Sequence, residues 1–369
     1  MTSAATPSTG ATVDAGFHPL RVVDVRRDTA DAVGVTFAAP NDGPAWSFRH
    51  GQHLVLRRLF DRVELRRTYS LCSAAPDGPL RVGIRLVDGG AFSSWAHTEL
   101  AVGDIVEALP PGGHFTHDLD PAAARRYLLV AGGSGMTPLC SVAATVLAAE
   151  PRSTVTLLYV NRTTATTMLL DDIEDLRNRY LGRLQVWYSF TREDTALELL
   201  DGRLDATRLA LLVDRHVLPA APDVTFLCGP AGLVDVVRTF LIGRGTAADT
   251  VHVELFGAGE GRTARPAARV VTSDEAVVAT VTARLHGRTT TVDLYAGDTV
   301  LEAVERARPD VPYSCRAGVC ATCAARLTSG DVTMETVHGL TPAEVAGGLV
   351  LTCQARPTGD TVVVVDYDG

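Results

Sequence analysis

Short apolar runs alternate with turn residues over the first hundred residues after a polar N-terminal stretch. Glycine, proline, asparagine and aspartate separate the runs, as they do in sheets of short antiparallel strands. The candidate strands are Arg21–Val25, His53–Leu56, Arg67–Leu71 and Leu80–Leu86. This pattern predicts a small antiparallel β-barrel domain over residues 17–120.

From Arg126 onward the pattern changes to apolar strands that alternate with helical stretches. The candidate strands are Tyr127–Val130, Val155–Val160, Leu184–Ser189, Val224–Leu227 and Val251–Leu255. The candidate helices are Pro138–Ala149, Asp171–Tyr180 and Ala231–Leu241. Such alternation is typical of a parallel sheet covered by helices, so we expect an α/β domain over residues 121–257.

Two segments lack the apolar residues needed to build a core. Residues 1–16 are small and polar, and we expect a disordered tail; residues 258–276 read as an interdomain linker. Residues 277–369 then form a third, α+β domain. Its candidate elements are a hairpin of Ala279–Leu285 and Thr289–Leu294, a helix Thr299–Arg308 capped by Asp298, and a closing strand Val362–Val365.

Composition narrows the class of protein. The 369 residues are 46% hydrophobic and 21% charged, as expected for a globular chain of two or three domains. The net charge is −9 and the chain has no lysine, which argues against a nucleic-acid partner and excludes lysine Schiff-base and Walker-type phosphate chemistry. The apolar runs are far shorter than the ~20 residues of a membrane-spanning helix. We therefore expect a cytoplasmic protein without a membrane partner.

Four of the seven cysteines carry the strongest chemical signal. Cys315, Cys320, Cys323 and Cys353 have the spacing C-x4-C-x2-C-x29-C, which is the plant-type ferredoxin arrangement for a 2Fe-2S cluster. The residues between the first three are small enough for one tight loop to surround the cluster. A structural zinc site is the alternative, although zinc sites favour paired C-x2-C spacings. The isolated cysteines, Cys72, Cys140 and Cys228, are expected to be buried and inert.

Two motifs in the predicted barrel point to a flavin. In Arg67-Thr68-Tyr69-Ser70, arginine and serine can hold the phosphates of FAD while the tyrosine stacks on its ring. Gly90-Ala91-Phe92-Ser93 is a glycine turn that leads into a helix, whose N-terminus and Ser93 hydroxyl can bind a pyrophosphate. The alternative is that Tyr69 is an ordinary core aromatic and Arg67 a solvated charge.

Two glycine turns in the predicted α/β domain favour a nicotinamide dinucleotide. Both follow a strand, so their backbone can approach phosphates at the carboxyl edge of a parallel sheet. The first contains Gly132, Gly133, Ser134, Gly135 and Thr137, and the second contains Cys228, Gly229 and Pro230. We expect the two turns to form one crevice.

Further candidates follow other strands of this domain. Arg162 and Arg192, with Ser189, are placed to bind an adenosine 2′-phosphate, which favours NADPH over NADH; solvated loop arginines are the alternative. Glu254 and Phe256 are candidate catalytic residues beside the flavin, with Thr137. Ordinary strand alternation explains the first two almost as well.

In this order, the motifs resemble the ferredoxin–NADP reductase-type flavoproteins that carry a C-terminal plant-type ferredoxin domain. Within that family, Pro312–Cys320 and Val350–Pro357 are most similar to the reductases of phenylacetyl-CoA epoxidases and next to those of 3-ketosteroid 9α-hydroxylases. The resemblance implies a β-grasp fold for the last domain. It also implies that the RTYS motif and Ser93 contact FAD, and that Gly133, Thr137, Cys228 and Gly229 line the nicotinamide site.

The expected function is that of an oxygenase-system reductase. NADPH gives up two electrons as a hydride, FAD accepts them, and a 2Fe-2S cluster carries one at a time to an oxygenase component. A di-iron phenylacetyl-CoA epoxidase of phenylacetate catabolism is the first expected acceptor. An NADH-dependent reductase of a Rieske-type ring or 3-ketosteroid hydroxylase is the alternative, and a redox-sensing binding protein is an alternative of another class. The linker suggests that the cluster domain swings between the flavin and the acceptor.

Overall fold

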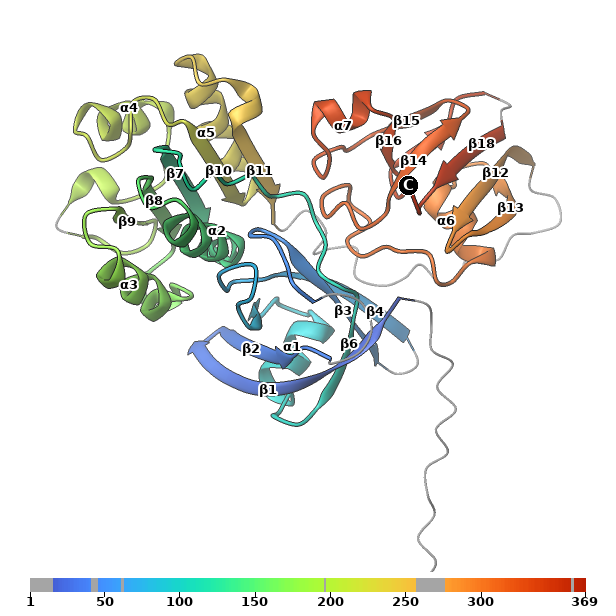
Figure 1. The fold of residues 1–369 in the computed structure, drawn as a ribbon, viewed down its shortest axis with the longest axis horizontal. Helices are drawn as coiled ribbons and strands as arrows, with labels where there is room; N and C mark the ends of the chain where they lie inside the picture. Colours follow the sequence, from blue (N-terminus) through green and yellow to red (C-terminus); the bar gives the residue numbers. More distant parts are fainter. Residues whose placement is uncertain (1–15, 41–45, 61–62, 196, 257–275, 360–361) are drawn as a thin grey trace, which may run out of the picture.

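The chain folds into three lobes (Figure 1). This computed structural model describes residues 16–40, 46–60, 63–195, 197–256, 276–359 and 362–369. The predicted tail and linker lie outside the described residues, except for Gly16 and Ala276. In the described part of the chain, no helix is long and apolar enough to cross a membrane.

The first lobe is the predicted antiparallel barrel. Its strands are β1 (His18–Thr29), β2 (Ala32–Ala38), β3 (His53–Phe60), β4 (Val63–Ser70), β5 (Leu80–Arg85) and β6 (Ile105–Ala108). They pair in the order β4-β3-β6-β1-β2-β5, and a bridge between Leu71 and Val82 joins the two edge strands. Helix α1 (Ala91–Thr98) lies between β5 and β6 in the chain. The four predicted strands are confirmed, whereas β2 and β6 were not predicted.

The second lobe is an α/β domain with a five-stranded sheet, β11-β10-β7-β8-β9, whose neighbouring strands are all parallel. Strands β7, β8 and β9 follow one another in one direction across the sheet, and β10 then lies on the other side of β7. The strand order therefore reverses between β7 and β10. Open α/β sheets bind ligands at such a point. The strands are β7 (Arg126–Gly132), β8 (Thr154–Asn161), β9 (Leu184–Phe190), β10 (Val224–Gly229) and β11 (Val251–Leu255). The helices are α2 (Met136–Ala149), α3 (Leu170–Arg179), α4 (Ala206–Asp214), which was not predicted, and α5 (Ala231–Gly243).

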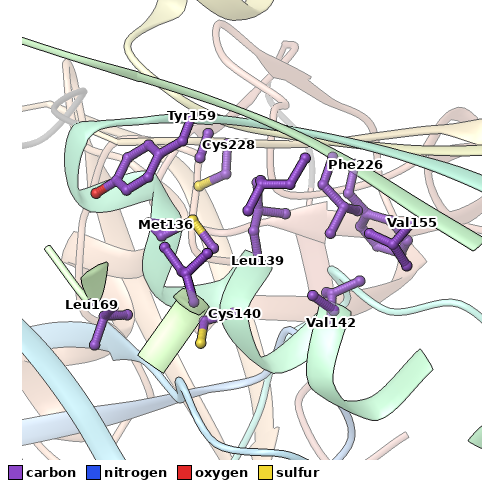
Figure 2. Close-up of a cluster of buried hydrophobic side chains, with 14 of the residues drawn as sticks. Met136, Leu139, Cys140, Val142, Val155, Tyr159, Leu169, Phe226 and Cys228 are labelled. Atoms are coloured by element: carbon purple, nitrogen blue, oxygen red, sulfur yellow. The ribbon is translucent and has the colours of Figure 1, made fainter. Parts of the chain in front are cut away.

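Helix α2 is buried on nearly all sides. Figure 2 shows Met136, Leu139 and Cys140 of this helix beside Tyr159 of β8 and Cys228 of β10. The same buried cluster includes residues of the barrel, namely Ala32, Cys72 and Phe115. A helix that is apolar all round is expected where two faces are covered, here by the sheet and by the barrel.

The third lobe is the predicted α+β domain. Its sheet has the order β13-β12-β18-β14-β16, in which the closing strand β18 is parallel to β12, and a separate pair joins β15 and β17. The strands are β12 (Val277–Leu285), β13 (Arg288–Tyr295), β14 (Ala324–Ser329), β15 (Val332–Met334), β16 (Leu349–Leu351), β17 (Ala355–Pro357) and β18 (Val362–Asp366), and the helices are α6 (Val300–Ala307) and α7 (Pro342–Ala346).

The predicted cap of α6 is wrong by one residue. Thr299 caps the helix: its hydroxyl accepts from the Glu302 backbone N–H at 3.3 Å, and the Glu302 carboxylate accepts from the Thr299 N–H at 2.8 Å. This is a reciprocal capping box, which a threonine followed three residues later by glutamate can form. Asp298 instead accepts from the Tyr295 N–H at 3.1 Å and pairs with Arg306 at 2.8 Å.

Candidate redox site

The four predicted cluster cysteines lie at one end of the third lobe. Cys315, Cys320 and Cys323 occupy the loop between α6 and β14, and Cys353 follows β16, which pairs with β14. The Cys323 carbonyl accepts hydrogen bonds from the Thr352 N–H at 3.2 Å and the Thr352 hydroxyl at 2.8 Å. These bonds tie the distant cysteine to the loop that holds the other three.

The loop backbone is shaped to wrap a small group. Arg316, Gly318 and Ala321 all have positive φ, and a Cβ on Gly318 would lie 2.4 Å from the Thr336 carbonyl oxygen. The N–H groups of Ala317 and Cys320 each lie 3.4 Å from the Cys315 sulfur. In the described residues, no three cysteine, histidine or acidic side chains converge on a single metal ion. The four thiols and the inward N–H groups of this loop are the donors that a thiolate-bound iron–sulfur cluster uses.

The electrostatics of the loop favour a thiolate at Cys315. The Cys320 thiol and the backbone N–H groups lower the pKa of Cys315 to about 6, because they donate hydrogen bonds to its sulfur. The Arg316 guanidinium donates to Glu305 at 2.6 Å and lies 4.0 Å from the centre of the Tyr313 ring.

Strand β4 carries the predicted flavin motif. Arg67 is partly buried, and burial lowers its pKa, so that an anionic phosphate nearby would stabilise its charge. The Tyr69 ring centre lies 5.6 Å from that of Phe92, which brings the two predicted flavin motifs together. The Thr68 hydroxyl, however, donates to the Ser314 hydroxyl in the third lobe at 2.6 Å.

The glycine turn before α1 contributes its backbone more than its side chains. Phe92 and Ser93 are buried in the described structure. The Ser93 hydroxyl accepts from the Val87 N–H and donates to the Gly90 carbonyl, both at 3.1 Å. Gly90, at the N-cap, makes no side-chain cap, so the first N–H groups of α1 are the phosphate donors that this turn can offer.

Three predicted residues from different elements meet beside β4. The Ser70 hydroxyl donates to Glu254 Oε2 at 3.5 Å, and the Cys228 thiol lies 4.0 Å from the same oxygen. Burial, followed by the nearby Cys320 sulfur, raises the pKa of Glu254 to about 8. Burial also raises the pKa of Cys228 well above its usual range. The group can therefore hold a proton on Glu254 at neutral pH, beside the flavin motif.

The two predicted glycine turns are in contact. A Cβ on Gly135 would lie 2.2 Å from the Cys228 carbonyl oxygen, and a Cβ on Gly229 would lie 2.9 Å from the Gly132 backbone. Only glycine permits this approach at the point where the strand order reverses. Pro230 lies against Gly132, and the Phe256 N–H donates to the Gly229 carbonyl at 3.0 Å.

Thr137 and the turn before it begin helix α2. Gly133, with a φ of 54°, starts a single 3-10 turn that includes Ser134 and Gly135. The buried Thr137 hydroxyl donates to the Ser134 carbonyl at 3.0 Å, and its methyl group faces Gly83 of the barrel. Thr137 therefore lies where the nucleotide domain meets the barrel.

The structure keeps the two predicted 2′-phosphate arginines together but buries Ser189. Arg162 and Arg192 are neighbours at the carboxyl ends of β8 and β9, because the Arg192 N–H donates to the Arg162 carbonyl at 2.9 Å. The Arg162 guanidinium pairs with Asp31 of the barrel at 3.0 Å. Ser189 is fully buried in the sheet and faces away from solvent.

Comparison with known proteins decides the family. Residues 19–117 match oxidoreductase FAD-binding domains, residues 129–239 match oxidoreductase NAD-binding domains, and residues 283–358 match 2Fe-2S iron–sulfur cluster binding domains. The chain is 40% identical to one of the subunits of 1,2-phenylacetyl-CoA epoxidase from Escherichia coli (strain K12), over 95% of this chain and 98% of the relative. The chain belongs to the family of oxygenase reductase components.

Further relatives agree with this assignment. The reductase is 34% identical to the 3-ketosteroid-9-alpha-monooxygenase ferredoxin reductase component of Mycobacterium tuberculosis, with 95% of each chain covered. Phthalate dioxygenase reductase matches with a TM-score of 0.57 and 25% identity, over 95% of this chain and 98% of that chain. An intact type IV self-sufficient cytochrome P450 monooxygenase supports the fold, with a TM-score of 0.67 at 24% identity over 95% of this chain and 41% of that chain.

The reductase is thus an oxidoreductase with FAD-binding, NAD-binding and 2Fe-2S domains. The sequence interpretation missed two residues near the redox site, Arg66 and Tyr313, which join the barrel to the cluster domain. Arg66 directly precedes the predicted strand Arg67–Leu71, so extending that strand by one residue would have placed Arg66 on the face opposite Arg67. Nothing in the sequence indicates which segment that side contacts.

Proposed function

We propose that this reductase passes electrons from NADPH through FAD and a 2Fe-2S cluster to a di-iron phenylacetyl-CoA epoxidase. The observation that carries the proposal is the 40% identity to the Escherichia coli epoxidase component over almost the full length of both chains. The flavin motif, the paired glycine turns and the four-cysteine loop lie on adjoining lobes, as a chain of electron carriers requires. A 3-ketosteroid monooxygenase is the second candidate acceptor, since its reductase is 34% identical.

Different residues of this chain serve the different cofactors. Nicotinamide and flavin supply hydride chemistry when bound, and a 2Fe-2S cluster supplies one-electron transfer. Arg67 and the start of α1 bind phosphate, Tyr69 packs against the flavin ring, and the turns at Gly132 and Gly229 admit the dinucleotide. Glu254 holds a proton beside Ser70, while Phe256 and Thr137 line the contact between the two domains. Cys315, Cys320, Cys323 and Cys353 bind the cluster.

The choice of NADPH rests on the adjoining Arg162 and Arg192, whose charges suit a 2′-phosphate. A cytoplasmic location is the natural setting, because no disulfide joins any of the seven cysteines and a thiolate-bound cluster is compatible with a reducing compartment.

The test is reconstitution of the complete path. We expect anaerobic NADPH to bleach both the flavin and the cluster bands of the purified protein. Addition of the oxygenase component of a phenylacetyl-CoA epoxidase, phenylacetyl-CoA and oxygen should then couple NADPH oxidation to epoxide formation. A 3-ketosteroid monooxygenase component with its steroid is the matched acceptor. Faster coupled turnover with the steroid system would reassign the partner, and reduction without turnover by any acceptor would favour a redox sensor.

A further inference from the structure

Strand β4 has two faces with different partners. Side chains alternate along a strand, so Arg67 and Tyr69 share one face, and Arg66 and Thr68 share the other. Arg67 and Tyr69 belong to the proposed flavin site. Arg66 and Thr68 both contact the segment 309–314 of the third lobe, which ends immediately before Cys315.

Arg66 is the centre of this contact. Its side chain is only 3% exposed, and its guanidinium donates to the Val311 carbonyl at 3.1 Å and to the Pro309 carbonyl at 3.2 Å. Glu64, on the same strand, accepts from its Nε at 2.7 Å. The rigid fork of arginine is suited to two carbonyl acceptors at once, which lysine cannot reproduce.

Tyr313 completes the contact from the cluster side. The Arg66 guanidinium carbon lies 4.1 Å from the centre of the Tyr313 ring, and that of Arg316 lies 4.0 Å from it. A cation over an aromatic ring is favourable, more so when it is desolvated as Arg66 is. One arginine of the barrel and one arginine of the cysteine loop thus bind the same ring, which links the barrel to the loop that holds the cluster.

A second polar contact across this boundary is weaker. His114 pairs with Glu344 at 3.2 Å, but their side chains are 48% and 24% exposed. Exposed pairs of this kind contribute little. Among the described residues, the hydrogen bonds that hold the cysteine loop against the barrel therefore come mainly from β4, while Val319 of the loop packs against the apolar core of the nucleotide domain.

We propose that Arg66, assisted by Thr68, is a positioning residue that holds the cysteine loop at a fixed distance from the flavin face of β4 and so sets the rate of flavin-to-cluster electron transfer. The inference rests on the proposed function. Each hydride brings two electrons to the flavin, and the cluster accepts one at a time. Every transfer therefore oxidises the flavin by one electron and reduces one iron of the cluster.

The test replaces Arg66 in the full-length protein with its cofactors. Arg66→Met keeps the apolar stem and removes the donors, and Arg21→Met, at an exposed arginine of the same barrel, is the control. Anaerobic stopped-flow separates flavin reduction by NADPH from cluster reduction. We expect Arg66→Met to leave flavin content and flavin reduction unchanged and to slow cluster reduction about tenfold or more, since two hydrogen bonds from a charged group are lost. Amide hydrogen exchange over residues 309–316 should become faster in the same variant.

A second pair of variants covers the case in which Arg66→Met does not fold. Tyr313→Leu removes the aromatic ring that Arg66 contacts, whereas Tyr313→Phe keeps it. We expect the first to slow cluster reduction and speed amide exchange, and the second to resemble the wild type. Wild-type rates and exchange in Arg66→Met, or equal behaviour of the two Tyr313 variants, would overturn this inference alone. A wild-type protein that binds no flavin or no cluster would overturn the proposed function together with it.

Discussion

The barrel contacts its two neighbours in different ways. Towards the nucleotide domain the apolar core is continuous, because Ala32, Cys72 and Phe115 of the barrel belong to the same buried cluster as helix α2. Towards the cluster domain the described residues of the barrel share no such core; that domain's buried cluster contains only its own residues, and the contact is polar and concentrated on β4.

Charged side chains also join the barrel to the nucleotide domain. Asp172 of α3 accepts from Arg26 and Arg81 of the barrel, both at 2.7 Å, and Asp28 accepts from the Leu169 N–H at 2.8 Å. These contacts come from several elements on each side. Hydride transfer needs nicotinamide and flavin held in close, fixed contact. The core that the barrel shares with the nucleotide domain can hold them in this way. The cluster must also reach an external acceptor, and a polar contact between the barrel and the cluster domain can open without exposing an apolar core.

The largest expected effect comes from removing a cluster ligand. Cys353→Ser should abolish iron and sulfide binding, because plant-type clusters need all four thiolates. The barrel and nucleotide domain should keep their shared core, so flavin binding and flavin reduction by NADPH should persist. Iron, sulfide and flavin analysis with visible spectra of the same sample tests this. Cys72→Ser, at a cysteine outside the loop, should retain a full cluster.

Loss of flavin reduction in Cys353→Ser would contradict the comparison. It would mean that the cluster domain supports the hydride-transfer site, so that the polar contact on β4 is not separable from it.

The second prediction weakens the barrel–nucleotide contact. Asp172→Asn removes the charge that Arg26 and Arg81 share, and we expect a loss of about 2 kcal/mol in the unfolding free energy of these two domains, between the values for exposed and buried pairs. Calorimetry of the full chain measures it. Asp171→Asn, at the exposed neighbouring position, should change stability little. Equal effects of the two substitutions would show that the ion pairs contribute nothing.

The third prediction concerns pH. His252 stacks on Phe226 with ring centres 4.6 Å apart, and burial, followed by His117, lowers its pKa from 6.5 to about 4. Between these values the unfolded chain binds a proton that the folded protein does not, so stability is lost as pH falls from 6.5 towards 4. His252→Phe keeps a ring against Phe226 and should reduce this slope by up to about 1.4 kcal/mol per pH unit.

Denaturant unfolding at several pH values tests the third prediction. His338→Phe, at an exposed histidine of the cluster domain, is the control and should leave the slope unchanged. An unchanged slope in His252→Phe would mean that His252 does not remain neutral in the folded protein.

Much of this architecture was predictable because its signals are local. The cysteine spacing, the glycine turns and the apolar strands each depend on a few neighbouring residues, and the structure confirms the predicted strands and the burial of Cys72, Cys140 and Cys228. Strands β2 and β6 of the barrel, helix α4, and, in the third lobe, strands β14 to β17 and helix α7 were missed. Asp298 was predicted to cap α6, whereas the structure uses Thr299, which has a glutamate partner three residues later.

Long-range contacts were not predictable in the same way. Arg66 and Val311 lie 245 residues apart in the chain, and no sequence pattern pairs them. The orientation of side chains inside a motif was also hidden: Ser93 and Ser189 have the right chemistry for phosphate, yet both are buried. These features depend on how the elements pack against one another, whereas local sequence preference determines only which elements form.

The smallest expected effect concerns the nucleotide. Arg162 pairs with Asp31 at 3.0 Å, and the same Asp31 oxygen lies 3.1 Å from Arg85 Nε, so the barrel already neutralises part of the charge offered to a 2′-phosphate. Arg162→Ala should therefore raise the KM for NADPH only about three- to tenfold and leave that for NADH nearly unchanged. Arg152→Ala, at an exposed arginine before β8, should affect neither. Equal increases in the KM for both nucleotides would show that Arg162 is not part of the 2′-phosphate site. An unchanged KM for NADPH would show that the Arg162 guanidinium binds only Asp31 and serves the contact between the barrel and the nucleotide domain.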